Sequence, residues 1–199
     1  MVVNLLGECD KRPVLYTLIK LFQTLGDVLV VSDDPKIMRL ADDNGHYQNT
    51  MIAYTSEGID EFFVDFPYNK DDFEWTIIVN IPTADADLFL YVKSLLPSED
   101  EQTMLEYLDE YETLELFKPG VLDKSTPYRV EQFEAYRNMP PMSPGVVNAV
   151  CTVLSKHMNK DVKTLAGIAT VSYPAPAGAH SEKSLPIPKF SFKKGGGKR

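Results

Sequence analysis

The residues best suited to chemistry form a short loop near the start of the chain, Gly7-Glu8-Cys9-Asp10-Lys11-Arg12. The loop follows Val2-Val3-Asn4-Leu5-Leu6, which has the pattern of a short buried strand, and it precedes an amphipathic helix. Nucleotide-binding α/β proteins hold phosphate at such a junction, because the free backbone N–H groups and the dipole of a helix N-terminus favour anions. The sequence therefore predicts a candidate nucleotide or anion site that includes Gly7, Lys11 and Arg12.

The loop lacks the side chains that handle phosphate in a P-loop. A P-loop reads G-x-x-x-x-G-K-[ST]: its glycines let backbone N–H groups approach the phosphates, its lysine bridges them, and its hydroxyl holds Mg²⁺. Counted from its glycine, this loop has Arg12 in place of the second glycine, Pro13 in place of the lysine and Val14 in place of the hydroxyl. Pro13 also lacks the N–H that would donate to a phosphate. Two interpretations stay open, a weakened nucleotide or anion site and an ordinary strand-to-helix loop.

Two aspartates follow the second predicted strand. Because a carboxylate at the end of an apolar strand can hold Mg²⁺ through water or contact a ribose, Asp33 joins the candidate nucleotide site. Asp34 has a simpler role, since an aspartate before Pro35 caps a helix. The Walker-B-like position after Ile77-Ile78-Val79 holds Asn80, a neutral and poorer metal ligand. We predict no catalytic residue, no metal site and no cofactor for this chain.

The remaining polar side chains form no recognisable catalytic or metal-binding set. The histidines show neither the spacing of a zinc site nor that of a catalytic triad, and they stand at His46, His157 and His180. The acidic cluster around Asp71-Asp72 lacks the glycine and the spacing of an EF-hand loop. Cys9 and Cys151 are far apart in the sequence, and we expect reduced thiols of a cytosolic protein.

Charge is distributed unevenly along the 199 residues, whose formal net charge is −9. Residues 172–199 carry six basic side chains and one acidic one, so residues 1–171 carry −14. An acidic body repels nucleic-acid phosphates, and nucleic acid is therefore not an expected partner. No apolar run reaches the roughly 18 residues of a membrane span, and no signal-like segment opens the chain. We expect a cytoplasmic protein that can lie peripherally at a membrane or associate with a virion.

The end of the chain alternates aromatic and basic residues, in Lys189-Phe190-Ser191-Phe192-Lys193-Lys194. Residues 172–199 are too rich in Pro, Gly, Ala and Lys to support a core, which predicts a flexible tail. The rings can enter a membrane interface while the lysines pair with anionic lipid, or they can stack on single-stranded bases. We favour a solvated tail that either screens the acidic body or docks on a partner, and the candidate contacts with a partner or a membrane are Lys189, Phe190, Phe192, Lys193 and Lys194.

The elements that position the loop are clearest in the first 42 residues. A helix from Pro13 is predicted to end at Gly26 as its C-cap, and its apolar residues recur at helical spacing. The apolar run 28–31 is typical of a central parallel strand. A second helix begins at Pro35 and directs Ile37, Met38 and Leu40 inward. This strand–helix–strand–helix order implies a parallel sheet.

The rest of the chain continues the alternation. The predicted strands are Thr50–Thr55, Glu61–Phe66, Trp75–Ile81 and Thr113–Phe117, with Asp87–Lys93 as either a strand or the start of a helix. The predicted helices are an acidic one after Ser98, then Tyr128–Arg137 and Pro144–Met158 with Ser143 as its cap, and a turn at Val162–Ile168. The predicted fold is α/β, with a doubly wound, mainly parallel sheet of five to seven strands and flanking helices, Rossmann-like or P-loop-like, over residues 1–171.

This order of elements resembles that of the ParA/MinD-like deviant P-loop ATPases. The likeness lies in Val2–Gly7, in the helix from Pro13, in Val28–Val31 followed by Asp33, and in the basic-aromatic C-terminus. The family's lysine and G-K-[ST] signature is not intact here, so its catalytic residues do not transfer. The resemblance implies a fold and a protein that positions or regulates partners at a surface.

From these observations we predict a non-catalytic, pseudo-ATPase-like regulatory or assembly protein, encoded by a phage or another mobile element. It would act through protein–protein contacts, and its basic tail would dock on a partner or an anionic surface. The alternatives are a structural or virion-assembly component of a phage and an unorthodox nucleotide-binding ATPase. The oligomeric state stays open.

Overall fold

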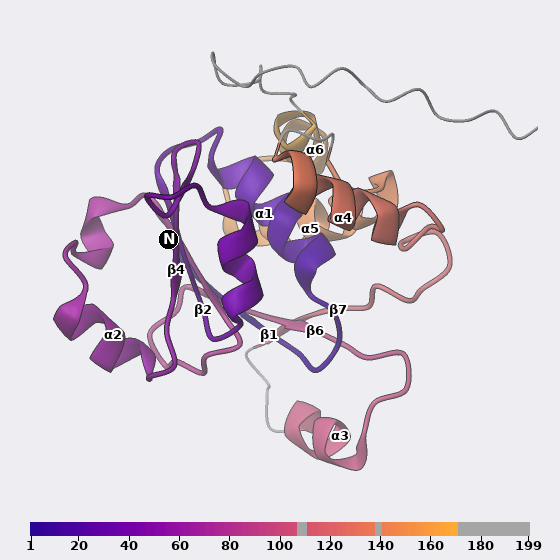
Figure 1. Cartoon of the computed structure of the whole chain (residues 1–199). Helices are drawn as coiled ribbons and strands as arrows, with labels where there is room; N and C mark the ends of the chain where they lie inside the picture. Colours follow the sequence, from indigo (N-terminus) through magenta and orange to yellow (C-terminus); the bar gives the residue numbers. More distant parts are fainter. Residues whose placement is uncertain (107–110, 138–140, 171–199) are drawn as a thin grey trace, which may run out of the picture.

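A computed structural model describes residues 1–106, 111–137 and 141–170. Within these residues one seven-stranded sheet has the strand order β3-β4-β2-β5-β1-β6-β7 (Figure 1). Its strands are β1 (Val2–Leu6), β2 (Val28–Ser32), β3 (His46–Tyr47), β4 (Thr50–Tyr54), β5 (Trp75–Val79), β6 (Leu88–Val92) and β7 (Glu112–Leu114). The helices are α1 (Arg12–Phe22), η1 (Pro35–Leu40), α2 (Ile59–Asp65), η2 (Lys70–Asp72), α3 (Glu99–Glu106), α4 (Thr126–Tyr136), α5 (Pro144–His157) and α6 (Val162–Ala169).

The sheet is parallel except at one edge, where β3 pairs with β4 in antiparallel fashion. β1 pairs with β5 on one side and β6 on the other, and β5 also pairs with β2. β5 therefore separates β1 from β2, the two strands that α1 connects. Because the other six strands run in the same direction, their carboxyl ends meet along one edge of the sheet. Loops that follow these strands share that edge, which is where open α/β sheets bind ligands.

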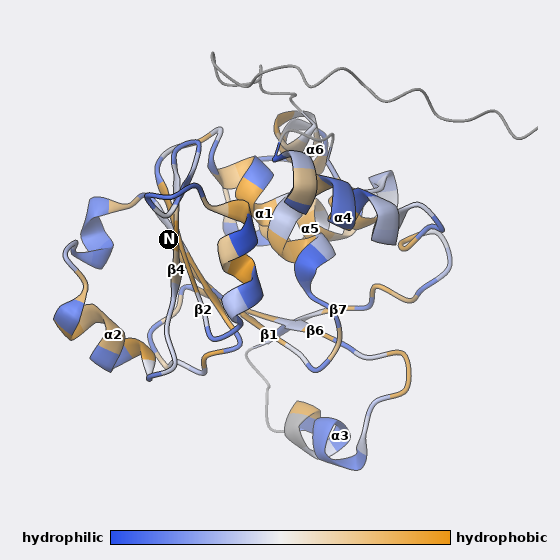
Figure 2. Cartoon of the chain, viewed as in Figure 1, coloured by the Kyte–Doolittle hydropathy of each residue, from blue (hydrophilic) through white to orange (hydrophobic). Residues whose placement is uncertain are grey.

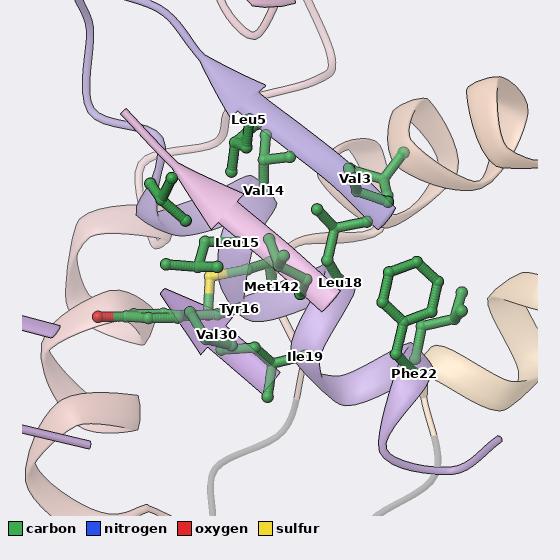
Figure 3. Close-up of a cluster of buried hydrophobic side chains, with 14 of the residues drawn as sticks. Val3, Leu5, Val14, Leu15, Tyr16, Leu18, Ile19, Phe22, Val30 and Met142 are labelled. Carbon is green, nitrogen blue, oxygen red and sulfur yellow. The ribbon is translucent and has the colours of Figure 1, made fainter. Parts of the chain in front are cut away.

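Helices cover the sheet unequally. α1 packs with α4, α5 and α6 on one face, and α2 lies on the other (Figure 1). Residues 13–22 of α1 are all buried, and Figure 3 shows Val14, Leu18 and Phe22 packed toward strand side chains. Side chains of a strand alternate between the faces, so Val28 and Val30 join the core under α1 while Leu29 and Val31 join the smaller cluster under α2. The inner strands accordingly carry apolar side chains on both faces, and Figure 2 shows apolar colouring along these strands.

The structure confirms the predicted α/β class and the mainly parallel sheet with flanking helices. It also resolves the ambiguous segment 87–93, which forms strand β6. The candidate contacts of the tail, at Lys189, Phe190, Phe192, Lys193 and Lys194, lie outside the described residues.

One predicted strand is wrong, because residues 61–66 belong to helix α2 and its end. The residues that pack beneath the helix, Ile59, Phe62, Phe63 and Phe66, recur at helical spacing. Val64, which a strand pattern would count with its apolar neighbours, is 81% exposed. Two acidic residues in the first turn also favour the helix N-terminus electrostatically.

Several predicted details of the helices are also corrected. α1 ends at Phe22, four residues before the predicted cap, and the Gly26 N–H donates to the Phe22 carbonyl in the turn that follows. Residues 35–40 form a 3₁₀ helix, whose tighter turn leaves Met38 38% exposed instead of facing inward. Ser143 is the N-cap residue of α5, as predicted, but its hydroxyl donates to the Val121 carbonyl at 3.1 Å instead of accepting from the first turn of the helix.

Candidate functional site

A cleft of about 510 Å³ opens at the carboxyl edge of the sheet, beyond the ends of β1, β2 and β5. The loop after β1, the first turn of α1, the 3₁₀ helix η1 and helix α4 form its walls. The charged residues among its lining are Asp10, Lys11, Arg12, Asp34, Lys36, Arg39 and Glu134. The topology thus brings the predicted loop to the position where this class of sheet binds ligands.

Gly7 fixes the loop against the sheet. Its φ of +136° lies in the region that favours glycine, and a Cβ at this position would lie 2.3 Å from the carbonyl oxygen of Val92. The Cys9 thiol lies 3.5 Å from the same carbonyl oxygen and 3.7 Å from that of Lys93, within reach of a weak hydrogen bond. The loop is therefore packed closely on the end of β6.

The Lys11 side chain turns back onto its own loop. Its ammonium group donates to the carbonyl oxygens of Gly7 and Cys9, the latter at 3.3 Å. Burial lowers the pKa of Lys11, and nearby groups that include Asp33 oppose this shift. A P-loop lysine directs its ammonium group to a phosphate. The ammonium group of Lys11 is instead bonded to carbonyl groups of its own loop.

Asp10 occupies the position at the start of α1 where an external anion would bind. Its Oδ1 accepts from the backbone N–H of Arg12 at 3.0 Å and from the Arg12 Nε at 2.9 Å. Its Oδ2 accepts from Arg12 Nη2 at 2.8 Å. Burial would raise the pKa of Asp10, but the hydrogen bonds from Arg12 outweigh it and lower the pKa.

The other N–H groups of the first helical turn are also engaged. Pro13 has none, and the N–H groups of Val14 and Leu15 donate to the Lys11 carbonyl at 3.0 and 2.9 Å. The helix N-terminus is thus satisfied by the chain itself, and no open nest of N–H groups faces the cleft among residues 12–15.

A carboxylate from a distant helix completes the closure. Glu134 of α4 accepts from Arg12 Nη1 at 3.0 Å and from the Tyr16 hydroxyl at 2.7 Å, both at its Oε1. Tyr16 is buried and stacks on Phe133, with ring centroids 4.7 Å apart. Burial, together with the hydrogen bond to Glu134, raises the pKa of Tyr16. The guanidinium of Arg12 is therefore held between two carboxylates of the same chain.

The aspartates after β2 have separate roles. The Asn80 amide donates to Asp33 Oδ1 at 2.7 Å, and Asn80 itself adopts a left-handed φ of +67° at the end of β5. Asp34 caps η1, since its Oδ1 accepts from the Lys36 N–H at 2.9 Å. The described residues contain no group of three or more His, Cys, Asp or Glu side chains suited to a metal.

All four candidate site residues follow β1 or β2 at the carboxyl edge of the sheet, where Lys11 and Arg12 line the cleft and Gly7 and Asp33 are not among its lining residues. The structure adds residues that the sequence analysis missed, namely Tyr16 and Glu134, and the cations Lys36 and Arg39 on η1. Neither of these two cations forms an ion pair with the residues that the structure describes. Lys36 and Arg39 are three residues apart, and on a 3₁₀ helix this spacing places two side chains on the same side, so the sequence contained a signal for this pair. No local sequence pattern indicated Glu134.

No protein-family model matches the sequence, and no curated protein matches it either. None of the described helices is long and apolar enough to cross a membrane.

Proposed function

We propose that this protein is a non-catalytic regulatory or assembly protein that has a P-loop-like arrangement without P-loop chemistry. One observation carries the proposal: the loop Gly7–Arg12 is closed by its own side chains and by Glu134. The Asp10 carboxylate stands in the place of an anion at the helix N-terminus.

The closed loop makes phosphate binding costly. A phosphate would have to displace Asp10 from three hydrogen bonds with Arg12 and draw Lys11 away from two carbonyl groups. Hydrogen bonds to charged groups contribute about 1.5–3 kcal/mol each. Even with discounting for the partial exposure of Arg12 and Asp10, the exchange offers a phosphate no net gain in hydrogen bonds.

The proposed action is through contacts with other molecules. The acidic body and the aromatic-basic tail, with charges of −14 and +5 on residues 1–171 and 172–199, suit a protein partner or an anionic surface that the tail approaches. A cytoplasmic protein of this kind would lie peripherally at a membrane or on a virion when its tail is bound. A phage or mobile-element origin remains part of this proposal.

Thermal melting of the full chain with nucleotides tests the proposal. We expect no shift in melting temperature with 5 mM ATP, GTP or ADP, each with and without Mg²⁺, and no hydrolysis. Saturation at 100 times Kd would stabilise a binding protein by about 2.7 kcal/mol, or roughly 5–10 °C for a chain of this size. Such a shift would overturn the non-catalytic proposal.

The cleft itself favours a second candidate, an unorthodox nucleotide-binding ATPase. Lys36 and Arg39 line the cleft without an ion pair among the described residues, and the volume of about 510 Å³ lies in the range of small-molecule sites. If a nucleotide shifts the melting temperature, the double variant K36A/R39A should abolish the shift when η1 holds the phosphates. The variant R12A should abolish it when the loop does.

A further inference from the structure

The closed loop leaves part of the cleft at the carboxyl edge open to a ligand. Asp10 and Arg12 bond to each other, and Lys11 bonds to carbonyl groups of its own loop. By contrast, the side chains of Lys36 and Arg39 on η1, which also line the cleft, have no hydrogen-bond or ion-pair partner in the part of the chain that the structure describes. The two are three residues apart on a 3₁₀ helix, a spacing that places both on one side and about 6 Å apart along the helix axis. This wall of the cleft therefore offers two cations to a ligand.

The adjoining wall of the cleft offers a carboxylate oxygen. α4 packs against η1, and Glu134 of α4 lines the same cleft as the two cations. Its Oε1 accepts from both Arg12 and Tyr16, whereas its Oε2 accepts no hydrogen bond from any described residue. The Glu134 side chain is only 13% exposed. A carboxylate oxygen in this position attracts an ammonium group and repels a further carboxylate or phosphate.

A buried hydroxyl group also lines the cleft. Ser32, the last residue of β2, is 1% exposed, and its Oγ accepts from the Asp34 N–H at 3.1 Å. Among the described residues the Ser32 hydroxyl donates to no acceptor. Because a hydroxyl can donate as well as accept, its hydrogen is available to an anionic group of a ligand.

The balance of charges in the cleft matches a ligand with two carboxylates and one ammonium group. The charged lining residues, four basic and three acidic, give the cleft a net charge of +1, although residues 1–171 together carry −14. We propose that the cleft binds an acidic α-amino acid of the size of aspartate or glutamate, for which a volume of about 510 Å³ is ample. Its carboxylates would pair with Lys36 and Arg39, and its ammonium group would donate to Glu134 Oε2. A nucleoside triphosphate has no ammonium group and would bring negative charge against Glu134.

Equilibrium dialysis of the full chain against tritiated L-glutamate and tritiated L-aspartate tests the proposal. We expect saturable binding of at least one of the two, at one molecule per chain. Glutarate lacks the ammonium group and γ-aminobutyrate lacks one carboxylate. Each should compete at least about tenfold more weakly than L-glutamate or L-aspartate, because each loses a hydrogen bond between charged groups. The absence of saturable binding for both amino acids, or equal competition by glutarate, would overturn the proposal.

Substitutions in the cleft assign the contacts. K36A/R39A should weaken binding at least about tenfold, whereas K160A/K163A, which removes two exposed lysines near the start of α6 and outside the cleft, should leave it unchanged. E134Q keeps a carbonyl acceptor for Tyr16 but removes the negative charge, so glutarate should then compete as well as the amino acid.

Full binding by K36A/R39A, or an E134Q variant that still discriminates against glutarate, would contradict the proposal. Trp75 emission checks the fold of each variant, and the comparison of ligands on the unchanged protein decides if a variant fails to fold. The inference goes beyond the non-catalytic function, since it adds a small ligand without a reaction. A nucleotide-induced shift in melting temperature would overturn that function and leave the dialysis result unaffected, so the two failures are distinguishable.

Discussion

Removal of the Glu134 carboxylate should destabilise the protein, because this group connects α4 to the closed loop. In E134A, the hydroxyl of Tyr16 loses its acceptor at 2.7 Å, and Arg12 loses one of its two carboxylates. Tyr16 is 1% exposed, so in the folded protein its hydroxyl depends on Glu134 for an acceptor.

The expected loss follows from these two contacts. A buried hydroxyl left without a partner costs about 1–3 kcal/mol. The pair with Arg12 adds at most about 1 kcal/mol, because the Arg12 side chain is 43% exposed and keeps its bonds to Asp10. E134A should therefore lower the free energy of unfolding by about 1–4 kcal/mol. Y16F, which leaves Glu134 paired with Arg12, should lower it by about 1 kcal/mol.

Urea unfolding followed by the emission of Trp75 measures these changes. Trp75 is the only tryptophan and stacks on Phe22 with ring centroids 4.4 Å apart, so its emission reports on the core. E131A, on the exposed surface of the same helix, is the control and should change stability by less than about 0.5 kcal/mol. The double variant Y16F/E134A should fall short of the sum of the single effects by about 1 kcal/mol. Additive effects, or an E134A variant as stable as E131A, would refute the described closure.

Further predictions concern the glycines and the thiols. G7A should cost about 2 kcal/mol or more in urea unfolding, because its Cβ would collide with the Val92 carbonyl and its φ is positive, whereas G167A, in open space on α6, should stabilise by about 0.5–1 kcal/mol. Burial raises the pKa of the Cys151 thiol from 9.0 to about 11, so an aromatic disulfide reagent at pH 7.5 should label the half-buried Cys9 first and Cys151 only on unfolding. Because unfolding lowers that pKa, the contribution of Cys151 to stability is complete below pH 9 and is lost as the pH rises to about 11, and C151A should show a shallower alkaline decline in urea unfolding.

Local patterns were sufficient to predict the architecture around the loop. The apolar run Val28–Val31 and the spacing of three and four in α1 each have one structural interpretation, and the strand–helix–strand order then requires a parallel sheet. Residues 61–66 have two structural interpretations. The run Phe62-Phe63-Val64 is apolar enough for a strand, and the spacing of Ile59, Phe62 and Phe66 also fits a helix. The structure distinguishes the two, because the residues that pack on the core are those on one side of a helix and Val64 is exposed. A short window of sequence does not show which of its residues face the core.

The candidate site was predictable only in part, for a similar reason. Gly7, Lys11 and Arg12 share one strand-to-helix junction, so their proximity follows from local structure. The partner that closes the loop, Glu134, lies 122 residues from Arg12 and packs there because α4 crosses the start of α1. That contact depends on the tertiary arrangement of helices, which periodicity within a helix does not specify.

Backbone amide chemical shifts offer the most direct measurement of the central claim, that the chain itself satisfies the phosphate-binding positions of its loop. The spectra of the ¹⁵N-labelled full chain would be compared without and with 5 mM MgATP, for the amides of Arg12, Val14 and Leu15. We expect unchanged shifts, because Asp10 and the Lys11 carbonyl already engage the N–H groups at the start of α1. Saturable shifts of Arg12, Val14 and Leu15 would contradict the claim, since they would place the nucleotide where the Asp10 carboxylate now lies.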